Sequence, residues 1–312
     1  MSVFLALGSH SSVQAEDLRA TKLNQGTIGL LASQPDLLSA ALKISNAVDH
    51  VDGLRVLPIV GRGGLQSIND LLFLRGVDAA MISSDALAYV EKNGLYKDEA
   101  PKISYLAKLA NSNVIILARP EFTTLESLDG KRIAVGSSES DEFIAADLIF
   151  GGLGLRYESV GMSGETAVSG MRDKTIAATV FAGADAYSLL AEIDAKSGFH
   201  ILPITANEKL GQTYSPAILS HTDFPNLIPA DSAVETIASA LVLAVFDWPD
   251  RSEHFYKLTR FNAALSANYF ATLGQEHATN FSAAVPGWKP YLTITEPRRK
   301  QLPKTLPVTA LQ

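Results

Sequence analysis

The sequence predicts an α/β protein built from two βα units. Short apolar stretches that end in glycine or small hydroxyl residues alternate with stretches of helical spacing, three times within residues 26–93 and again from residue 133. Hydrophobic residues make up 47% of the 312 residues and charged residues 19%, which is typical of a globular protein with a substantial core. Because strands alternate with helices, we expect parallel strands whose carboxyl-end loops carry the functional site.

The first unit is expected to contain three strands, each ended by a short polar loop. Apolar runs at residues 26–31, 54–60 and 79–82 predict the strands, and helical spacing follows each of them to about residues 48, 75 and 93. In a parallel sheet the loops that follow the strands gather at one edge. The candidate ligand-binding residues in these three loops are Ser33, Gln34, Arg62, Gly63, Ser83 and Ser84.

The second unit repeats this pattern after a β-rich connection. Residues 103–118 are predicted to form two β-type segments with Asn111-Ser112-Asn113 between them. The loop after the strand at 177–181 adds Ala182 and Gly183 to the candidate site. The strands of this unit are expected at residues 133–135, 159–160, 177–181 and 200–202, with helices between the first three and a further helix to about residue 197.

The stretch at residues 123–143 organises this second unit. Gly136 ends an apolar strand, and the loop Ser137-Ser138-Glu139-Ser140 opens a helix. Free backbone N–H groups at a helix N-terminus and the helix dipole both favour a carboxylate or phosphate, so the four loop residues are candidate ligand contacts. The alternative interpretation is an ordinary serine cap.

The two chain ends are expected to lie outside the packed units. An apolar run followed by Val13-Gln14-Ala15 resembles a secretory signal with an A-x-A-like cleavage site, although the positively charged n-region is missing. Residues 1–15 are therefore interpreted as a signal-peptide remnant, with a disordered tail as the alternative, and the protein as periplasmic. An apolar run at residues 234–246 is far shorter than the about 20 residues of a membrane span. Helices are expected within residues 250–273, and the tail at 293–312 is expected to be mobile.

Composition and motifs argue against several function classes. A net charge of −7 without a Lys/Arg cluster argues against nucleic-acid binding, and the absence of cysteine removes disulfides, thiol nucleophiles and Cys-ligated metals. The six histidines lack metal-binding spacing, and no nucleophile elbow, Walker A or dinucleotide-binding motif occurs. We therefore expect a protein that is not an enzyme and that uses no cofactor and no metal ion.

Two segments of the chain resemble a known family. Residues 61–85 contain a glycine-rich turn, an Asn-containing helix and a G-x-D-h-a-h-h-x-x-D pattern, in which h is apolar. Residues 125–136 match the pattern L-x-G-K-r-h-x-h-G. In this order the segments resemble the TAXI family, the solute receptors of TRAP-type transporters, and the resemblance extends over about residues 26–291.

The resemblance implies a two-lobed periplasmic-binding-protein (Venus flytrap) fold with two hinge strands. Lobe 1 would comprise residues 26–113 and 220–292, and lobe 2 residues 114–219 with the hinge strands at its edges. The family implies a small carboxylate-bearing ligand, an amino acid or organic acid, delivered to the membrane permease subunits of a transporter. We expect a monomer. Two loops depart from the family pattern, because residues 30–36 lack a Gly/Thr-rich sequence and residues 137–141 include two acids.

Charged residues near the expected cleft leave the sign of the ligand's charge open. Arg62 could hold a carboxylate through two parallel hydrogen bonds, or it could be an ordinary solvated arginine. Glu139 and Asp141 could favour the helix N-terminus electrostatically, or they could contact a ligand ammonium. Asp78 and Asp85 are interpreted as turn and cap residues.

Two other functions are alternatives to solute delivery. A sensory or partner-recruiting module would use the same cleft without feeding a transporter. A periplasmic enzyme on this scaffold, such as a lyase, would need a catalytic base in the cleft, and the sequence indicates none. Solute capture coupled to hinge closure is the function that the sequence favours.

Overall fold

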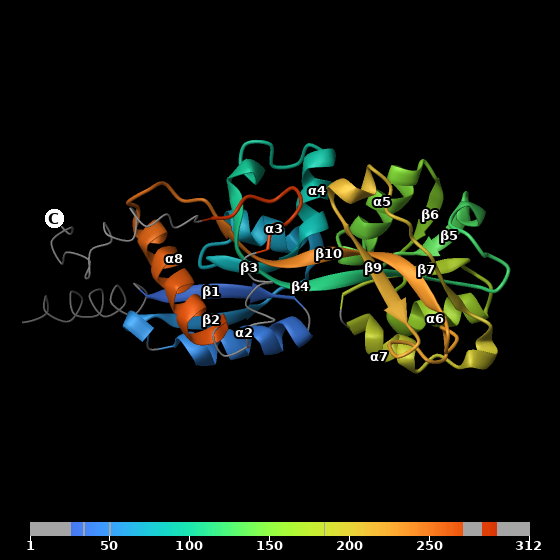
Figure 1. The fold of residues 1–312 in the computed structure, drawn as a ribbon. Coiled ribbons are helices and arrows are strands. Elements are labelled where there is room, and N and C mark those ends of the chain that lie inside the picture. The colour runs from blue at the N-terminus through green and yellow to red at the C-terminus, as the bar shows by residue number, and fades with distance from the viewer. Residues whose placement is uncertain (1–25, 34, 50, 184, 271–282, 292–312) are drawn as a thin grey trace, which may run out of the picture.

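A mixed sheet with helices on both faces runs the length of the molecule (Figure 1). The computed structural model describes residues 26–33, 35–49, 51–183, 185–270 and 283–291. Within them the sheet has ten strands in the order β2-β1-β3-β10-β4-β7-β5-β6, with β8 (His200–Leu202) paired to β4 and β9 paired to β10. The predicted α/β class is confirmed. The predicted signal segment and C-terminal tail lie outside the described residues.

Three parallel strands form one end of the sheet. They are β1 (Thr27–Ala32), β2 (Arg55–Val60) and β3 (Ala79–Ser83), and β1 pairs with both of the others. Five of the six residues of β1 are buried because helices and neighbouring strands cover both of its faces, which explains its continuous apolar run. The helices that follow the three strands are α2 (Pro35–Val48), α3 (Gly64–Phe73) and α4 (Ser84–Lys92).

The same arrangement forms the other end. Here β5 (Lys131–Ala134) pairs in parallel with β6 (Tyr157–Val160) and β7 (Ala178–Ala182). The helices are α5 (Asp141–Leu153), α6 (Gly164–Arg172) and α7 (Asp185–Ala191). The predicted helix to residue 197 is therefore two pieces, since a 3-10 turn follows α7. The short 3-10 helices are η1 (Val51–Gly53), η2 (Ala100–Lys102), η3 (Glu126–Leu128), η4 (Ala195–Ser197) and η5 (Leu210–Gln212).

Two long antiparallel strands, β4 (Ile103–Ala118) and β10 (Ala233–Phe246), join the two halves. The predicted division of residues 103–118 into two segments is wrong, because Asn111-Ser112-Asn113 stay paired with β10. The segment predicted as the second hinge strand lies at β9 (Ser215–Ser220). That strand pairs with β10 alone among the described residues, whereas β10 itself continues into the first half.

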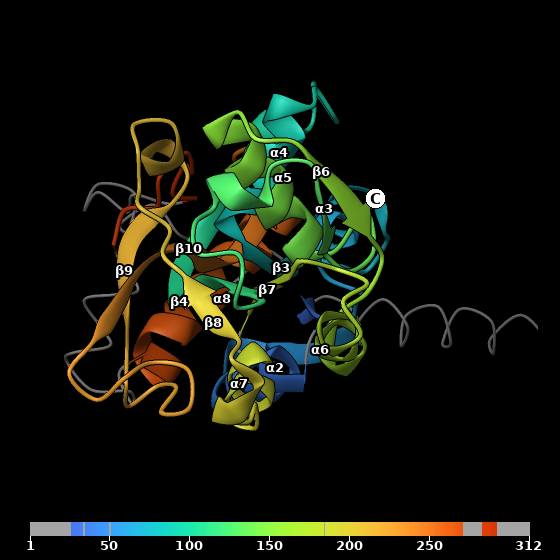
Figure 2. The same cartoon turned by 90° about the vertical axis from the view of Figure 1, so that its right-hand side faces the viewer.

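The helices divide between the two faces of the sheet, and each half has its own apolar core. Figures 1 and 2 show α4 and α5 on one face and α2, α6 and α7 on the other. One buried cluster surrounds β1 and α2 in the first half, and another surrounds β5 and α5 in the second. Ile144 of α5 is fully buried in a cluster that contains Ile68 and Ala86 of the first half. The two halves therefore share apolar contact on the α4/α5 face.

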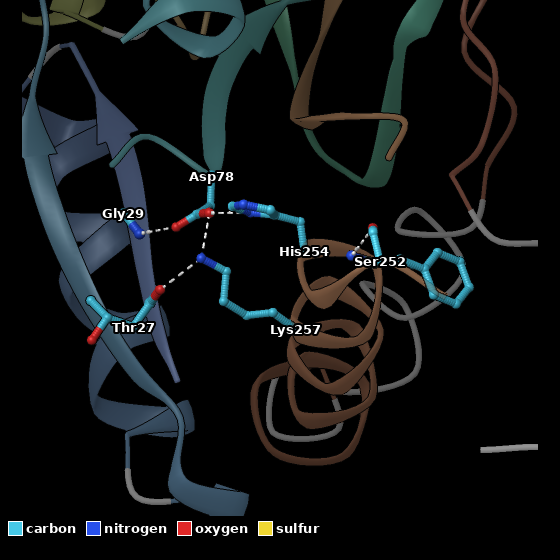
Figure 3. A network of polar contacts seen from close by, with 7 residues as sticks. Thr27, Gly29, Asp78, Ser252, His254 and Lys257 are labelled. Carbon is cyan, nitrogen blue, oxygen red and sulfur yellow. Dashed lines mark hydrogen bonds and ion pairs between the residues drawn. The ribbon is translucent and has the colours of Figure 1, made fainter. Parts of the chain in front are cut away.

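Near the C-terminal end of the described chain, α8 (Glu253–Ala264) packs on the first half and continues into a π-helical segment (Leu265–Tyr269). Asp78 holds α8 in place through polar contacts (Figure 3). Lys257 Nζ lies 2.5 Å from Asp78 Oδ1 and donates to the Thr27 carbonyl at 3.1 Å, and Gly29 N–H donates to Asp78 Oδ2 at 3.0 Å. Asp78 therefore links α8 to the amino ends of β1 and β3, a role beyond the turn residue that the sequence suggested.

Candidate ligand-binding cleft

A cavity of about 380 Å³ lies between the two halves of the molecule. It sits at the carboxyl ends of β1, β3 and β7, beside the middle of β4 and the first turns of α2, α3, α5 and α7. The carboxyl ends of parallel strands from both halves thus face one cavity, which is where α/β sheets bind ligands. The lining residues are Ser33, Leu37, Gly64, Met81, Ile82, Ser83, Ala110, Asn111, Ser112, Asn113, Asp141, Ala182, Gly183, Tyr187 and Leu241.

Neutral polar groups line the side of the cavity that β4 forms. Asn111, Ser112 and Asn113 interrupt an otherwise apolar strand, and Asn113 Nδ2 donates to the Tyr187 hydroxyl at 2.6 Å. The Tyr187 ring lies 4.9 Å from the ring of Phe224, and burial raises the pKa of its hydroxyl. Tyr187 is therefore a neutral hydroxyl held in a fixed orientation by one amide and one ring. This side of the cavity offers amide and hydroxyl hydrogen bonds without charge.

A buried carboxylate network lies behind the β3 end of the cavity. Asp85 is 1% exposed, and its carboxylate accepts hydrogen bonds from the hydroxyls of Ser83 and, at 2.9 Å, Tyr214. Ser83 Oγ also lies 2.8 Å from Ser239 Oγ of β10. Burial raises the pKa of Asp85, while the two hydroxyls lower it. The network connects α4, β10 and the residue before β9, so it links segments from both halves of the chain.

Asp141 brings a second carboxylate to the wall of the cavity itself. It is the first residue of α5, and the Gly64 N–H at the start of α3 donates a hydrogen bond to it. Burial, followed by the negative charges of Asp85 and Glu142, raises the pKa of Asp141 to about 7, although the Gly64 hydrogen bond acts in the opposite direction. The charged form of Asp141 is thus disfavoured in a cleft that holds no ligand.

The loop before α5 contacts the glycine-rich turn before α3 directly. Leu65 N–H donates to the Glu139 carbonyl at 3.0 Å, which joins the two halves through a backbone hydrogen bond. Ser140 caps α5, because its Oγ accepts from Phe143 N–H at 3.3 Å and donates to the Val135 carbonyl at 3.1 Å. Gly64 has φ +50°, and a Cβ there would lie 1.9 Å from the Glu139 oxygen. This close approach requires glycine.

The sequence-predicted site residues separate into three groups. Ser33, Ser83, Ala182 and Gly183 line the cavity, and Gly63 is buried beside Ser33 and Asp141. Ser84 lies behind the wall, where its Oγ accepts from Ala240 N–H at 2.9 Å, and Ser140 is the helix cap. Gln34 lies outside the described residues. The side chains of Arg62, Ser137, Ser138 and Glu139 are exposed to solvent and do not line the cavity.

Several lining residues were not among the candidates. Asn111, Ser112 and Asn113 were interpreted as a break between strands, although polar residues inside an otherwise apolar strand are themselves an indication of a site. Tyr187 and Leu37 lie in the first turns of helices, where their spacing resembles that of core residues. No local pattern distinguishes them from the core.

The described residues contain no group of three or more His, Asp or Glu side chains that could hold a metal ion. Among the helices in that part of the chain, none has the length and apolar character that crossing a membrane requires.

The chain belongs to the NMT1-like family, whose model matches residues 42–280. No curated protein matches the sequence significantly. Solved structures with a similar fold include a TctC solute-binding protein from Polaromonas, at 15% identity and a TM-score of 0.47, covering 83% of this chain and 91% of that one. Another is an ABC transporter periplasmic binding protein from Brucella ovis with glutathione bound, at 10% identity and a TM-score of 0.46, covering 81% and 70%. Such distant likenesses say nothing about which ligand this chain binds.

The raised pKa of Asp141 predicts a pH-dependent stability effect. Between its ordinary pKa of about 3.9 and the folded-state value of about 7, the native state holds a proton that the unfolded chain releases. The contribution of Asp141 to stability therefore falls as pH rises through this window. We expect Asp141→Asn to raise the free energy of unfolding of the ligand-free protein by about 2 kcal/mol at pH 8, a value discounted because the side chain is partly exposed.

Urea unfolding at pH 4, 6 and 8 checks this prediction. The difference between wild type and Asp141→Asn should be near zero at pH 4 and largest at pH 8. Glu165→Gln removes an exposed acid from the first turn of α6 and should show no such trend. An Asp141→Asn variant that is less stable than wild type at pH 8 would contradict the assigned shift.

Proposed function

We propose that this protein is an extracytoplasmic solute receptor of the TAXI type, which captures a small organic ligand and delivers it to the permease of a TRAP-type transporter. The observation that carries the proposal is the cavity of about 380 Å³ between strand ends of both halves. A ligand enclosed there would contact both halves at once. Binding would then favour their closed arrangement, which a membrane partner can recognise.

We propose β4 and β10 as the hinge. They are the two strands that run from one half into the other, and their register shifts between Leu241 and Val242 and between Leu243 and Ala244. Irregular pairing of this kind bends strands and marks places where a sheet can flex. The chain would then cross from one lobe to the other at the middle of β4 and at the middle of β10, and β9 would belong to the second lobe.

Binding without catalysis is the role that the wall of the cavity supports. Its polar groups are amides, hydroxyls and a single carboxylate among the described residues. Among the described residues the wall has no second carboxylate beside Asp141, and the Ser83 hydroxyl on the wall is held by Asp85 behind it and by Ser239. This arrangement supports a structural network more than the acid–base pair of an enzyme.

A thermal-shift screen of the purified protein tests this proposal. The ligands are amino acids, dicarboxylates, keto acids, sulfonates and small cations, and a ligand at a hundred times its dissociation constant should add about 2.7 kcal/mol of stability. Ser112→Trp should fill the cavity and abolish the shift, whereas Ser188→Trp on the exposed face of α7 should leave it intact. A ligand that stabilises both variants equally would place binding elsewhere and sink the proposal.

The transport role is tested separately in cells. Deleting the gene should abolish uptake of the ligand that the screen identifies, and Ser112→Trp should fail to restore it. Normal uptake in the deletion strain would favour the sensory or partner-recruiting alternative, because such a module binds the same ligand without feeding a permease.

A further inference from the structure

The wall of the cavity has an acidic charge balance. Among the fifteen residues that line it, Asp141 carries the one carboxyl group and none is Lys, Arg or His. Arg62, the cation that the sequence offered as a carboxylate anchor, is exposed to solvent and lies off the wall. A ligand carboxylate in this cavity would therefore meet a carboxylate and no balancing cation.

Asp141 has two negative neighbours and, among the described residues, a backbone donor in Gly64. Asp85 from α4 and Glu142 from α5 both act on it electrostatically, and the Gly64 N–H of α3 donates to it. The carboxylate of Asp85 accepts hydrogen bonds from the hydroxyls of Ser83 and Tyr214. These neutral donors leave the negative charge of Asp85 in place, so it still repels the Asp141 carboxylate. A partly buried carboxylate in such surroundings is stabilised by a cation that fits beside it.

We propose that the cleft selects a small organic amine and holds its ammonium group against the Asp141 carboxylate. This inference rests on the proposed function, since it names the ligand class of the same cavity. The geometry of the cavity identifies the binding site, and the acidic side chains determine the sign of the ligand charge that it accepts. The ligand's positive charge would offset the repulsion among Asp141, Asp85 and Glu142 and couple binding to the contact between the two halves.

The other walls narrow the ligand further. Leu37, Met81 and Leu241 offer apolar surface, while Asn111 and Asn113 offer neutral amide groups. An amine with an apolar body and one neutral polar group matches these walls. A dicarboxylate would bury two negative charges beside Asp141 without a partner, which costs more than hydrogen bonds to amides return.

The test combines the ligand that the protein carries with a panel of defined probes. Small molecules released from protein purified without denaturation are identified by mass spectrometry. The same protein is then screened with putrescine, cadaverine and choline, which carry no carboxylate, against succinate, malate and 2-oxoglutarate, which carry no ammonium group. We expect the released ligand or the stabilising probes to be amines. A released anion or neutral compound, or stabilisation by the anionic group alone, overturns the charge assignment and leaves the proposed receptor function in place.

Variants then locate the ammonium. Asp141→Asn should weaken binding of the amine by at least about 30-fold, as loss of one partner of a desolvated charge pair does, and Asp141→Glu should recover part of it. Glu165→Gln should change the affinity by less than about twofold, because it lies on the surface. Equal binding by Asp141→Asn and wild type overturns the inference. No released molecule and no stabilising probe would instead overturn the receptor function itself, and the inference with it.

Discussion

Replacing Gly64 by alanine should destabilise the protein by about 3 kcal/mol, the upper range for overpacked sites, because the new methyl group has no room. Its Cβ would lie 1.9 Å from the Glu139 oxygen and 3.0 Å from the Ser140 carbonyl carbon, both backbone atoms of the opposite half. The loop before α5 must then move away from α3. That movement breaks the hydrogen bond from Leu65 N–H to the Glu139 carbonyl and separates Asp141 from the Gly64 N–H.

Gly164 provides a matched control for backbone strain. Like Gly64 it is the first residue of a helix with positive φ, +55° against +50°, but a Cβ there would meet no atom within 4 Å. Gly164→Ala should therefore cost about 1 kcal/mol from the left-handed conformation alone. Urea unfolding measures both variants, and the excess cost at Gly64 is the cost of forcing the halves apart.

Ligand binding gives a second measure of the same contact. Gly64→Ala should weaken binding of the ligand that the screen identifies, since Gly64 and Asp141 both line the cavity. Gly164→Ala should bind normally. Equal unfolding free energies for the two variants would mean that the approach of the two halves at Gly64 contributes nothing to stability, and the argument for a joint cleft would lose its steric support.

The alternation of strands and helices was predictable because each strand of the first half is a short apolar run closed by a turn. β3, for example, ends at Ser83 and α4 begins at Ser84, as the polar loop there indicated. The continuity of β4 was not predictable, since Asn111-Ser112-Asn113 have the composition of a turn. They stay in the strand because β10 supplies the backbone partners and the cavity accommodates their side chains.

The site was predictable only where one loop defines it. Ser33, Ser83 and Gly183 line the cavity, and each lies at or directly after the end of a strand that the sequence predicts. The environment of Asp141 depends on Asp85, 56 positions earlier in the chain, and local sequence shows only a helix N-terminus. Arg62 lies between glycines that suggested a binding turn. The direction of its side chain, however, depends on how α3 packs against the second half, which the local sequence does not show.

Replacing Lys257 by methionine should cost about 3 kcal/mol or more, because it leaves a buried carboxylate without its cation. The side chains of Lys257 and Asp78 are 11% and 8% exposed, and Nζ lies 2.5 Å from Oδ1 (Figure 3). His254 is a second basic group near Asp78, and its Nδ1 lies 3.7 Å from the same oxygen while its ring stacks on Trp248. His254 cannot replace the shorter contact between Lys257 and Asp78 without losing its stacking on the Trp248 ring.

Lys289 and Asp247 form the matched control, an ion pair of the same 2.5 Å length whose side chains are 56% and 34% exposed. Lys289→Met should cost less than about 1 kcal/mol, because water already solvates both charges. Combining Lys257→Met with Asp78→Asn should recover part of the loss, since the uncompensated charge is then gone. Urea unfolding of the three variants separates burial from distance as the source of the effect. Equal losses at Lys257 and Lys289 would show that α8 is held by its apolar face alone.

Ligand binding should survive every one of these changes, because the Asp78 cluster lies at the amino ends of β1 and β3 and the cavity at their carboxyl ends.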